Sequence, residues 1–116
     1  MPLFKANGLS VADKISVLQQ AKRPLQLQIQ HGVVCKPDLR ATICDGLIDC
    51  RYIWGTSVGS KREVSVTIEI ANALGLGSHA SNVDRWSNGK NAQELLAALD
   101  ATIAFLGETN KGGPVR

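Results

Sequence analysis

The stretch RATICDGLIDCRYIW, residues 40–54, decides the fold that the sequence predicts. Its central Asp45-Gly46 has the composition of a two-residue turn between antiparallel strands. Pairing Cys44 with Leu47 across this turn sorts the side chains by face. One face collects Ala41, Ile43, Ile48, Cys50, Tyr52 and Trp54, and the other collects Arg40, Thr42, Asp49 and Arg51. Because most apolar residues share one face, residues 40–54 predict a β-hairpin.

Two further segments alternate with a period of two residues, which is typical of half-buried strands. LQLQIQ, residues 25–30, places its aliphatic side chains on one face and three glutamines on the other. EVSVTIEI, residues 63–70, turns Val64, Val66, Ile68 and Ile70 inward in the same way. Both segments are therefore predicted as strands beside the hairpin.

Helices are predicted at the two ends of the chain. Ser10 and Asp13 have the spacing of a capping box and open a helix over about residues 10–22. Asn91 and Glu94 repeat that spacing ahead of an apolar stripe that ends at Gly107. Residues 108–116 have nothing apolar to bury and are predicted to be a flexible tail.

Together these elements predict one α+β domain over residues 1–107, an antiparallel sheet with the N-terminal and C-terminal helices packed on one face. Unpaired edges of such a sheet favour a homodimer. The predicted core consists of Ile15, Leu18, Leu27, Ile29, Ile43, Ile48, Val66, Leu95, Leu99, Ile103 and Leu106.

Composition excludes some classes of protein and leaves others open. The hydrophobic fraction of 44% is ordinary for a globular domain, so disorder is not expected. Neither an apolar run of about 20 residues nor a signal peptide is evident, and three cysteines are an odd number, so we expect a cytoplasmic protein with reduced thiols. A net charge of +3 permits a nucleic-acid partner without requiring one.

Metal binding, catalysis and base stacking each have weak support. His31, Cys35, Cys44 and Cys50 are the compact set of metal ligands, but the hairpin register separates the last two, so no metal site is predicted. No motif pairs a nucleophile with a base, so no catalytic residue or cofactor is predicted, and an enzyme with a pocket of scattered residues stays open. Stacking of bases on Tyr52 and Trp54 competes with a place in the core, which their shared face with Ile43 favours.

The stretch IANALGLGSHASNVDRWSNGKN, residues 70–91, predicts two short helices joined by a glycine turn. Gly75 or Gly77 can end the first helix, and Ser78 or Ser81 can cap the second. Two large apolar residues three positions apart, Val83 and Trp86, would point inward together.

This stretch resembles the helix-turn-helix of Cro- and repressor-type bacterial and phage regulators, from Ile68 to Lys90. The residues that carry the resemblance are Ala71, Leu74, Gly75, Leu76, Val83, Trp86 and Gly89. It implies a further helix ahead of the pair and a second helix that reads DNA. The outward face of that helix would present Ser81, Asn82 and Arg85 to base edges, and Lys90 would contact a phosphate.

Two functions are therefore predicted. The first is a small non-enzymatic regulator, of the kind that mobile elements carry, that binds duplex DNA through residues 68–90. The alternative is a protein interaction module, an adaptor or inhibitor, or a small-ligand-binding domain, acting as a homodimer. In the alternative, residues 70–91 only connect the core elements, with Trp86 closing the core edge. The weak basic charge favours the module and VDRWSNGK favours DNA, so the accessibility of Asn82 and Arg85 distinguishes them.

Overall fold

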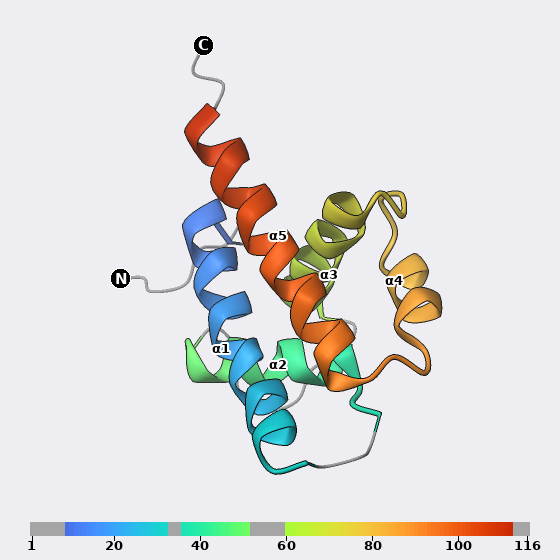
Figure 1. The fold of residues 1–116 in the computed structure, drawn as a ribbon. Coiled ribbons are helices and arrows are strands. Elements are labelled where there is room, and N and C mark those ends of the chain that lie inside the picture. Colours follow the sequence, from blue (N-terminus) through green and yellow to red (C-terminus); the bar gives the residue numbers. More distant parts are fainter. Residues whose placement is uncertain (1–8, 33–35, 52–59, 113–116) are drawn as a thin grey trace.

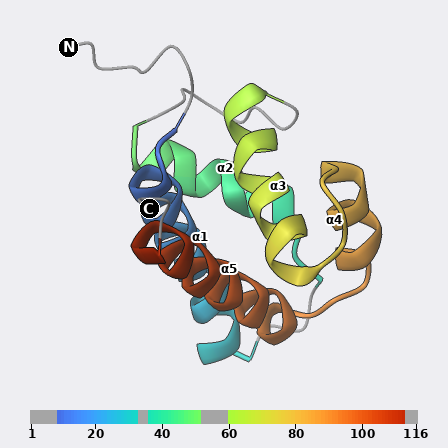
Figure 2. The ribbon, with the colours of Figure 1, turned by 90° about the horizontal axis from the view of Figure 1, so that it is seen from above.

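The computed structural model describes residues 9–32, 36–51 and 60–112, and every regular element in these ranges is a helix. The helices are α1 (Val11–Gln30), α2 (Leu39–Asp49), α3 (Lys61–Leu74), α4 (Ala80–Ser87) and α5 (Ala92–Gly112). The long helices α1 and α5 pack against each other, α2 packs on α1, and α3 bridges α2 and α5 (Figures 1 and 2). Since the described residues contain no strand, the predicted α+β fold is wrong.

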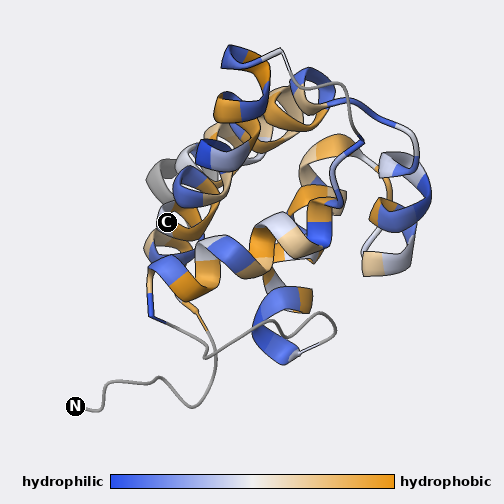
Figure 3. Ribbon diagram, turned by 90° about the horizontal axis from the view of Figure 1, so that it is seen from below, coloured by the Kyte–Doolittle hydropathy of each residue, from blue (hydrophilic) through white to orange (hydrophobic). Residues whose placement is uncertain are grey.

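One apolar cluster receives side chains from all five helices, and the apolar sides of the helices turn toward it (Figure 3). Its most deeply buried members include Leu18, Leu25, Ile43, Ile70 and Leu99. Two ion pairs join helices at the edge of this cluster. Lys14 on α1 pairs with Glu69 on α3, and Lys22 on α1 pairs with Asp100 on α5, each with 2.6 Å between nitrogen and oxygen. Of the predicted core, Leu18, Ile43, Val66, Leu95, Leu99 and Leu106 are buried, and Ile15, Ile48 and Ile103 are partly buried.

The predicted hairpin at Asp45-Gly46 is instead the middle of α2. Asp38 caps this helix, because its side chain accepts hydrogen bonds from the backbone N–H groups of Arg40 and Ala41. Gly46 is buried against α1, where an added Cβ would lie 2.5 Å from the carbonyl oxygen of Val17. The glycine therefore serves close helix packing, and the apolar residues of α2 follow the helical spacing of Leu39, Ile43 and Leu47.

The predicted strand over residues 25–30 is the last part of α1, which begins after the predicted Ser10 capping box and continues through Pro24. Leu25 is fully buried, whereas Leu27 is 53% exposed and Ile29 is 36% exposed. These two residues were predicted in the core. They lie outside it because a helix turns by about 100° per residue, so alternate residues cannot share one face.

The predicted strand over residues 63–70 lies in α3, which Ser60 caps through the backbone N–H of Glu63. The buried positions of α3 are Glu63, Val66, Thr67, Ile70 and Ala71, a helical spacing. Two of these five residues, Glu63 and Thr67, are polar, so the apolar residues alone did not show the helical period. The partly buried Val64 and Ile68 alternate with Val66 and Ile70, and this period of two residues wrongly indicated a strand.

At the C-terminal end, Asn91 and Glu94 form the predicted capping box, each side chain accepting a hydrogen bond from the other's backbone N–H. The helix that was predicted to end at Gly107 continues to Gly112. Tyr52, Trp54 and Cys35 lie outside the described residues. Within the described ranges, no helix combines the length and apolar character needed to cross a bilayer.

Candidate functional site

Residues 70–91 form the end of α3, a turn over residues 75–79, and α4. Gly75 ends α3 in the left-handed conformation, with φ of +71°. The N–H of Leu76 then donates to the carbonyl of Ala71 at 2.8 Å, and that of Gly75 donates to Asn72 at 3.3 Å. This pattern satisfies the last carbonyls of α3 and fixes the direction in which the chain leaves it.

Asn82 holds the turn from the first part of α4. Its Nδ2 donates to the carbonyl of Leu76 at 2.8 Å, and the side chain is half-buried. Gly77 lies beneath this amide with φ of +101°, and an added Cβ there would lie 2.9 Å from Nδ2. The backbone conformation of the turn therefore favours glycine at position 77, and a side chain there would displace the amide of Asn82.

The inward face of α4 carries Val83, which is fully buried, and Trp86, which is partly buried. Both pack against the apolar cluster, as the sequence predicts, although Trp86 is less buried than expected. Lys90 lies with Nζ 5.1 Å from the centre of the Trp86 ring and is itself half-buried. A cation over the face of an indole is attracted by the ring, so Lys90 stabilises the position of Trp86.

The outward face of α4 is accessible. Ser81, Asp84, Arg85 and Asn88 are exposed, and the helix lies at the edge of the fold, beside α3 (Figures 1 and 2). Arg85 donates from Nη2 to Oδ1 of Asn82 at 2.9 Å. Of the sequence-predicted DNA-binding residues, Ser81 and Arg85 therefore lie exposed on one side of α4, whereas Asn82 is bound to the turn and Lys90 to Trp86.

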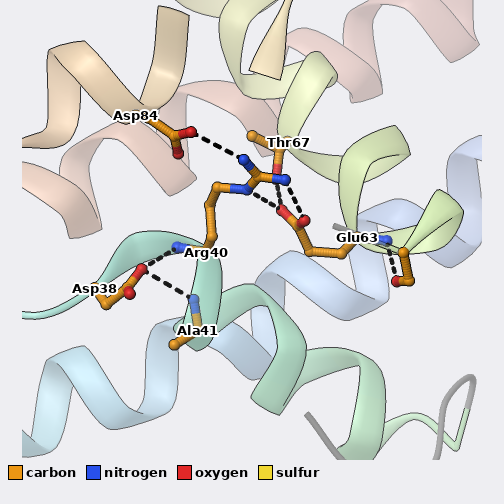
Figure 4. A network of polar contacts seen from close by, with 7 residues as sticks. Asp38, Arg40, Ala41, Glu63, Thr67 and Asp84 are labelled. Atoms are coloured by element: carbon orange, nitrogen blue, oxygen red, sulfur yellow. Dashed lines mark hydrogen bonds and ion pairs between the residues drawn. The ribbon is translucent and has the colours of Figure 1, made fainter. Parts of the chain in front are cut away.

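A buried ion pair braces the helices behind this face (Figure 4). Arg40 on α2 donates to Glu63 on α3 from Nε at 2.7 Å and from Nη2 at 2.5 Å. The Glu63 side chain is 0% exposed and also accepts a hydrogen bond from the hydroxyl of Thr67. The remaining Nη1 of Arg40 donates to Asp84 on α4 at 2.9 Å. One guanidinium therefore connects three helices.

The electrostatics of this network favour a permanently charged arginine. The hydrogen bonds that Arg40 donates to Glu63 raise the pKa of Arg40, and Asp84 adds to the same effect, while desolvation opposes it. A buried carboxylate is costly unless it is paired, and the two parallel hydrogen bonds from Arg40 supply that pairing. The network orients α4 relative to α2 and α3. A further hydrogen bond, from Nζ of Lys36 to the carbonyl of Gly89 at 3.0 Å, joins the segment before α2 to the segment after α4.

A hollow of about 480 Å³ lies between the start of α2 and the end of α4. Its charged lining combines Lys36 and Arg85 with Asp38 and Asp84. The mixture of signs gives no preference for a cation or an anion, so this hollow is not assigned a small ligand.

The described residues contain no group of three or more His, Cys, Asp or Glu side chains that could hold a metal ion. In the set considered from the sequence, Cys44 is buried in α2 and Cys50 is half-buried directly after it. Burial, followed by the nearby Asp49 and Asp13, raises the pKa of the Cys50 thiol. Cys50 is therefore a poor nucleophile at neutral pH.

Two residues of the site were missed in the sequence, Glu63 as the buried carboxylate and Arg40 as its partner. A signal was present, because Ser60 and Glu63 have capping-box spacing and so mark the start of a helix. Reading residues 60–74 with a period of 3.6 places Glu63 on the buried face, where a carboxylate needs a cationic partner.

Comparison of the chain with protein-family models, with curated proteins and with solved structures gives no match in any of the three.

Proposed function

We propose that the protein is a small cytoplasmic DNA-binding regulator, in which α3, the turn and α4 act as a helix-turn-helix and α4 enters the major groove. The observation that carries this proposal is the exposed outward face of a helix whose opposite face is fixed in the core. Ser81 and Arg85 are exposed four residues apart on α4, Asn88 directly after its end is exposed as well, and Val83 is fully buried. A groove-reading helix needs this combination of access and support.

The position of α2 gives further support. In the regulators that residues 68–90 resemble, a helix ahead of the pair braces it, and the sequence predicted strands and turns at that place. Here α2 packs against α3 and also contacts α4. The ion pair of Arg40 with Glu63 and Asp84 joins all three helices. The brace that the resemblance implies therefore has an equivalent in this chain.

The acidic residue on α4 is compatible with a phosphate backbone. Asp84 would repel phosphates if its charge were free, but its Oδ2 lies 2.9 Å from Nη1 of Arg40. The pairing reduces the field that the carboxylate exerts on a nearby anion. Lys36, which is exposed and donates to the carbonyl of Gly89, and the adjacent Lys90 supply cations for phosphate contacts.

The test is binding of the purified chain to a pool of random-sequence DNA duplexes, measured by fluorescence anisotropy at several salt concentrations. We expect the logarithm of the binding constant to fall linearly with the logarithm of salt, by about 0.9 per phosphate contact. Lys90→Ala should weaken binding to all sequences equally, and Arg85→Ala should change the preference among sequences. Absence of binding at low salt would refute the proposal.

A second candidate is a protein interaction module, and one observation favours it. Leu27 and Ile29 expose aliphatic surface near the end of α1, where an apolar partner could cover them. The homodimer predicted from unpaired sheet edges loses its basis, since no strand occurs in the described ranges. Replacement of both residues by glutamine should abolish partner binding under this candidate and leave DNA binding unchanged under the first.

A further inference from the structure

The geometry points to different roles for two residues of α4. Arg85 selects a guanine, and Asn82 positions Arg85 without reading a base itself. This inference rests on the proposed DNA-binding function and assigns specificity within the same face. It replaces the simpler expectation that Ser81, Asn82 and Arg85 all contact base edges.

The two polar ends of the Asn82 side chain already have partners within the protein. Nδ2 donates to the carbonyl of Leu76 at 2.8 Å, and Oδ1 accepts from Arg85 at 2.9 Å. An asparagine that reads adenine must present both atoms outward, to the N6 and N7 positions of the base. To do so, Asn82 would have to release the carbonyl of the turn and the guanidinium together. The half-buried Asn82 amide therefore keeps its hydrogen bonds within the protein when DNA binds.

Arg85, unlike Asn82, keeps most of its hydrogen-bond donors available. A guanidinium carries five N–H donors, and in the described part of the chain the one hydrogen bond of Arg85 is to Asn82. The nearest acidic residue in sequence, Asp84, is paired with Arg40 and does not compete for it. The free donors can form the bidentate contact with O6 and N7 of guanine that arginine makes most often. Holding the long side chain in place before binding reduces the entropy lost on contact.

Gly77 completes the arrangement. Any side chain at this position would meet Nδ2 of Asn82, 2.9 Å from the added Cβ, and would have to adopt a φ of +101°. The turn, the amide and the guanidinium thus form one connected unit, from Gly77 through Asn82 to Arg85. The conformation of the turn is coupled to the direction in which Arg85 points.

The experiment first selects bound duplexes from the random pool and then measures affinities for duplexes with single base-pair changes. We expect Arg85→Ala to lose a preference of about 5- to 150-fold for guanine at one base pair while keeping salt-dependent binding. Asn82→Ala should reduce the same preference at the same base pair. Gln19→Ala is the control, an exposed amide on α1 outside the proposed binding face, and should leave that base pair unaffected.

Asn82→Asp separates positioning from a merely structural role. It keeps an oxygen acceptor for Arg85, loses the donor to the Leu76 carbonyl and adds a negative charge. Overall DNA affinity and thermal stability should therefore fall, while the preference for guanine at that base pair persists. A DNA-free readout accompanies it: in nitrogen NMR spectra, rotation of the Arg85 guanidinium should be hindered in the wild type and freed by Asn82→Ala.

Different results would overturn different parts. If Asn82→Ala removes a preference at another base pair and leaves the Arg85 position intact, Asn82 reads a base and the inference is wrong. If folded Asn82→Asp loses the guanine preference as Asn82→Ala does, or if the guanidinium rotates freely in the wild type, the positioning role is also wrong. If the wild-type chain binds no duplex at low salt, the proposed function itself fails.

Discussion

Arg40 and Arg85 lie on neighbouring helices and differ in how much of their hydrogen-bonding capacity the protein uses. Arg40 has a side chain that is 15% exposed, and its donors go to Glu63 and Asp84. Arg85 is exposed, and within the described ranges it donates one hydrogen bond, to Asn82. The same type of side chain thus joins helices inside the protein at Arg40 and leaves a cation available to a partner at Arg85. The distinction matters because a partner can bind only groups that folding leaves accessible.

The two arginines should consequently respond to mutation in opposite ways. Removal of Arg40 leaves a buried carboxylate without its cation, which is a cost to the folded state. Removal of Arg85 takes away a solvated side chain whose protein contact is exposed, which has little effect on folding. Stability measurements and DNA-binding measurements should therefore rank the two substitutions in reverse order.

The largest expected effect on stability is that of Arg40→Ala. Because Glu63 is 0% exposed, we expect the free energy of unfolding to fall by about 3–5 kcal/mol, measured by urea denaturation. The double substitution of Arg40 by Met and Glu63 by Leu is the control, since replacing a buried pair by apolar groups is often neutral or stabilising. A loss as large in the double variant would show that the pair itself was not the cause.

Gly46→Ala should have the next largest effect. The added methyl group would meet the backbone oxygen of Val17 at 2.5 Å, so α1 and α2 must separate, at a cost of about 1–3 kcal/mol. Gly107→Ala in α5 is a matched control, because nothing lies within 4 Å of the added Cβ there. We expect that control to be neutral or stabilising by about 0.5–1 kcal/mol. Equal effects at both glycines in thermal unfolding would contradict the close approach of α1 and α2.

Gly46 also explains in part why the fold was mispredicted. Asp45-Gly46 has the composition of a tight turn, and local composition does not reveal that Gly46 faces the backbone of another helix. The alternations of residues 25–30 and 63–70 were equally ambiguous, because short apolar runs fit strands and helices alike. In α3 the buried face includes Glu63, whose partner Arg40 is distant in the sequence, and Thr67, which donates to Glu63.

Local signals were more reliable. The capping boxes at Ser10 and Asn91 were confirmed because each is a reciprocal hydrogen bond among residues three positions apart. The glycine exit of α3 and the inward Val83 were predicted for the same reason. The partners of Asn82 could not be predicted, since they depend on where the Leu76 carbonyl points after the turn has formed.

Asp84→Asn tests the exposed end of the Arg40 network. The Asp84 side chain is 48% exposed, so solvent screens its ion pair, and we expect a loss of only about 0.2–1 kcal/mol in urea denaturation. DNA affinity at low salt should not decrease, because a negative charge is removed from the proposed interface. A stability loss like that of Arg40→Ala would mean that Asp84, and not Glu63, is the partner that matters for folding.

Arg85→Ala should have the smallest effect on stability, within about 0.5 kcal/mol of the wild type, because it alters an exposed position. The same urea titration measures it. A substantially larger loss would indicate that the contact with Asn82 supports the turn itself.

The central claim, that the outward face of α4 is the DNA-binding surface, is tested most directly by NMR. Amide spectra of the labelled chain are compared with and without a duplex selected from the random pool, at low salt. We predict that the largest perturbations fall on Ser81, Arg85 and Asn88, and that residues near Leu27 and Ile29 on α1 stay unchanged. Perturbations centred on α1, or none at all at saturating duplex, would contradict the claim.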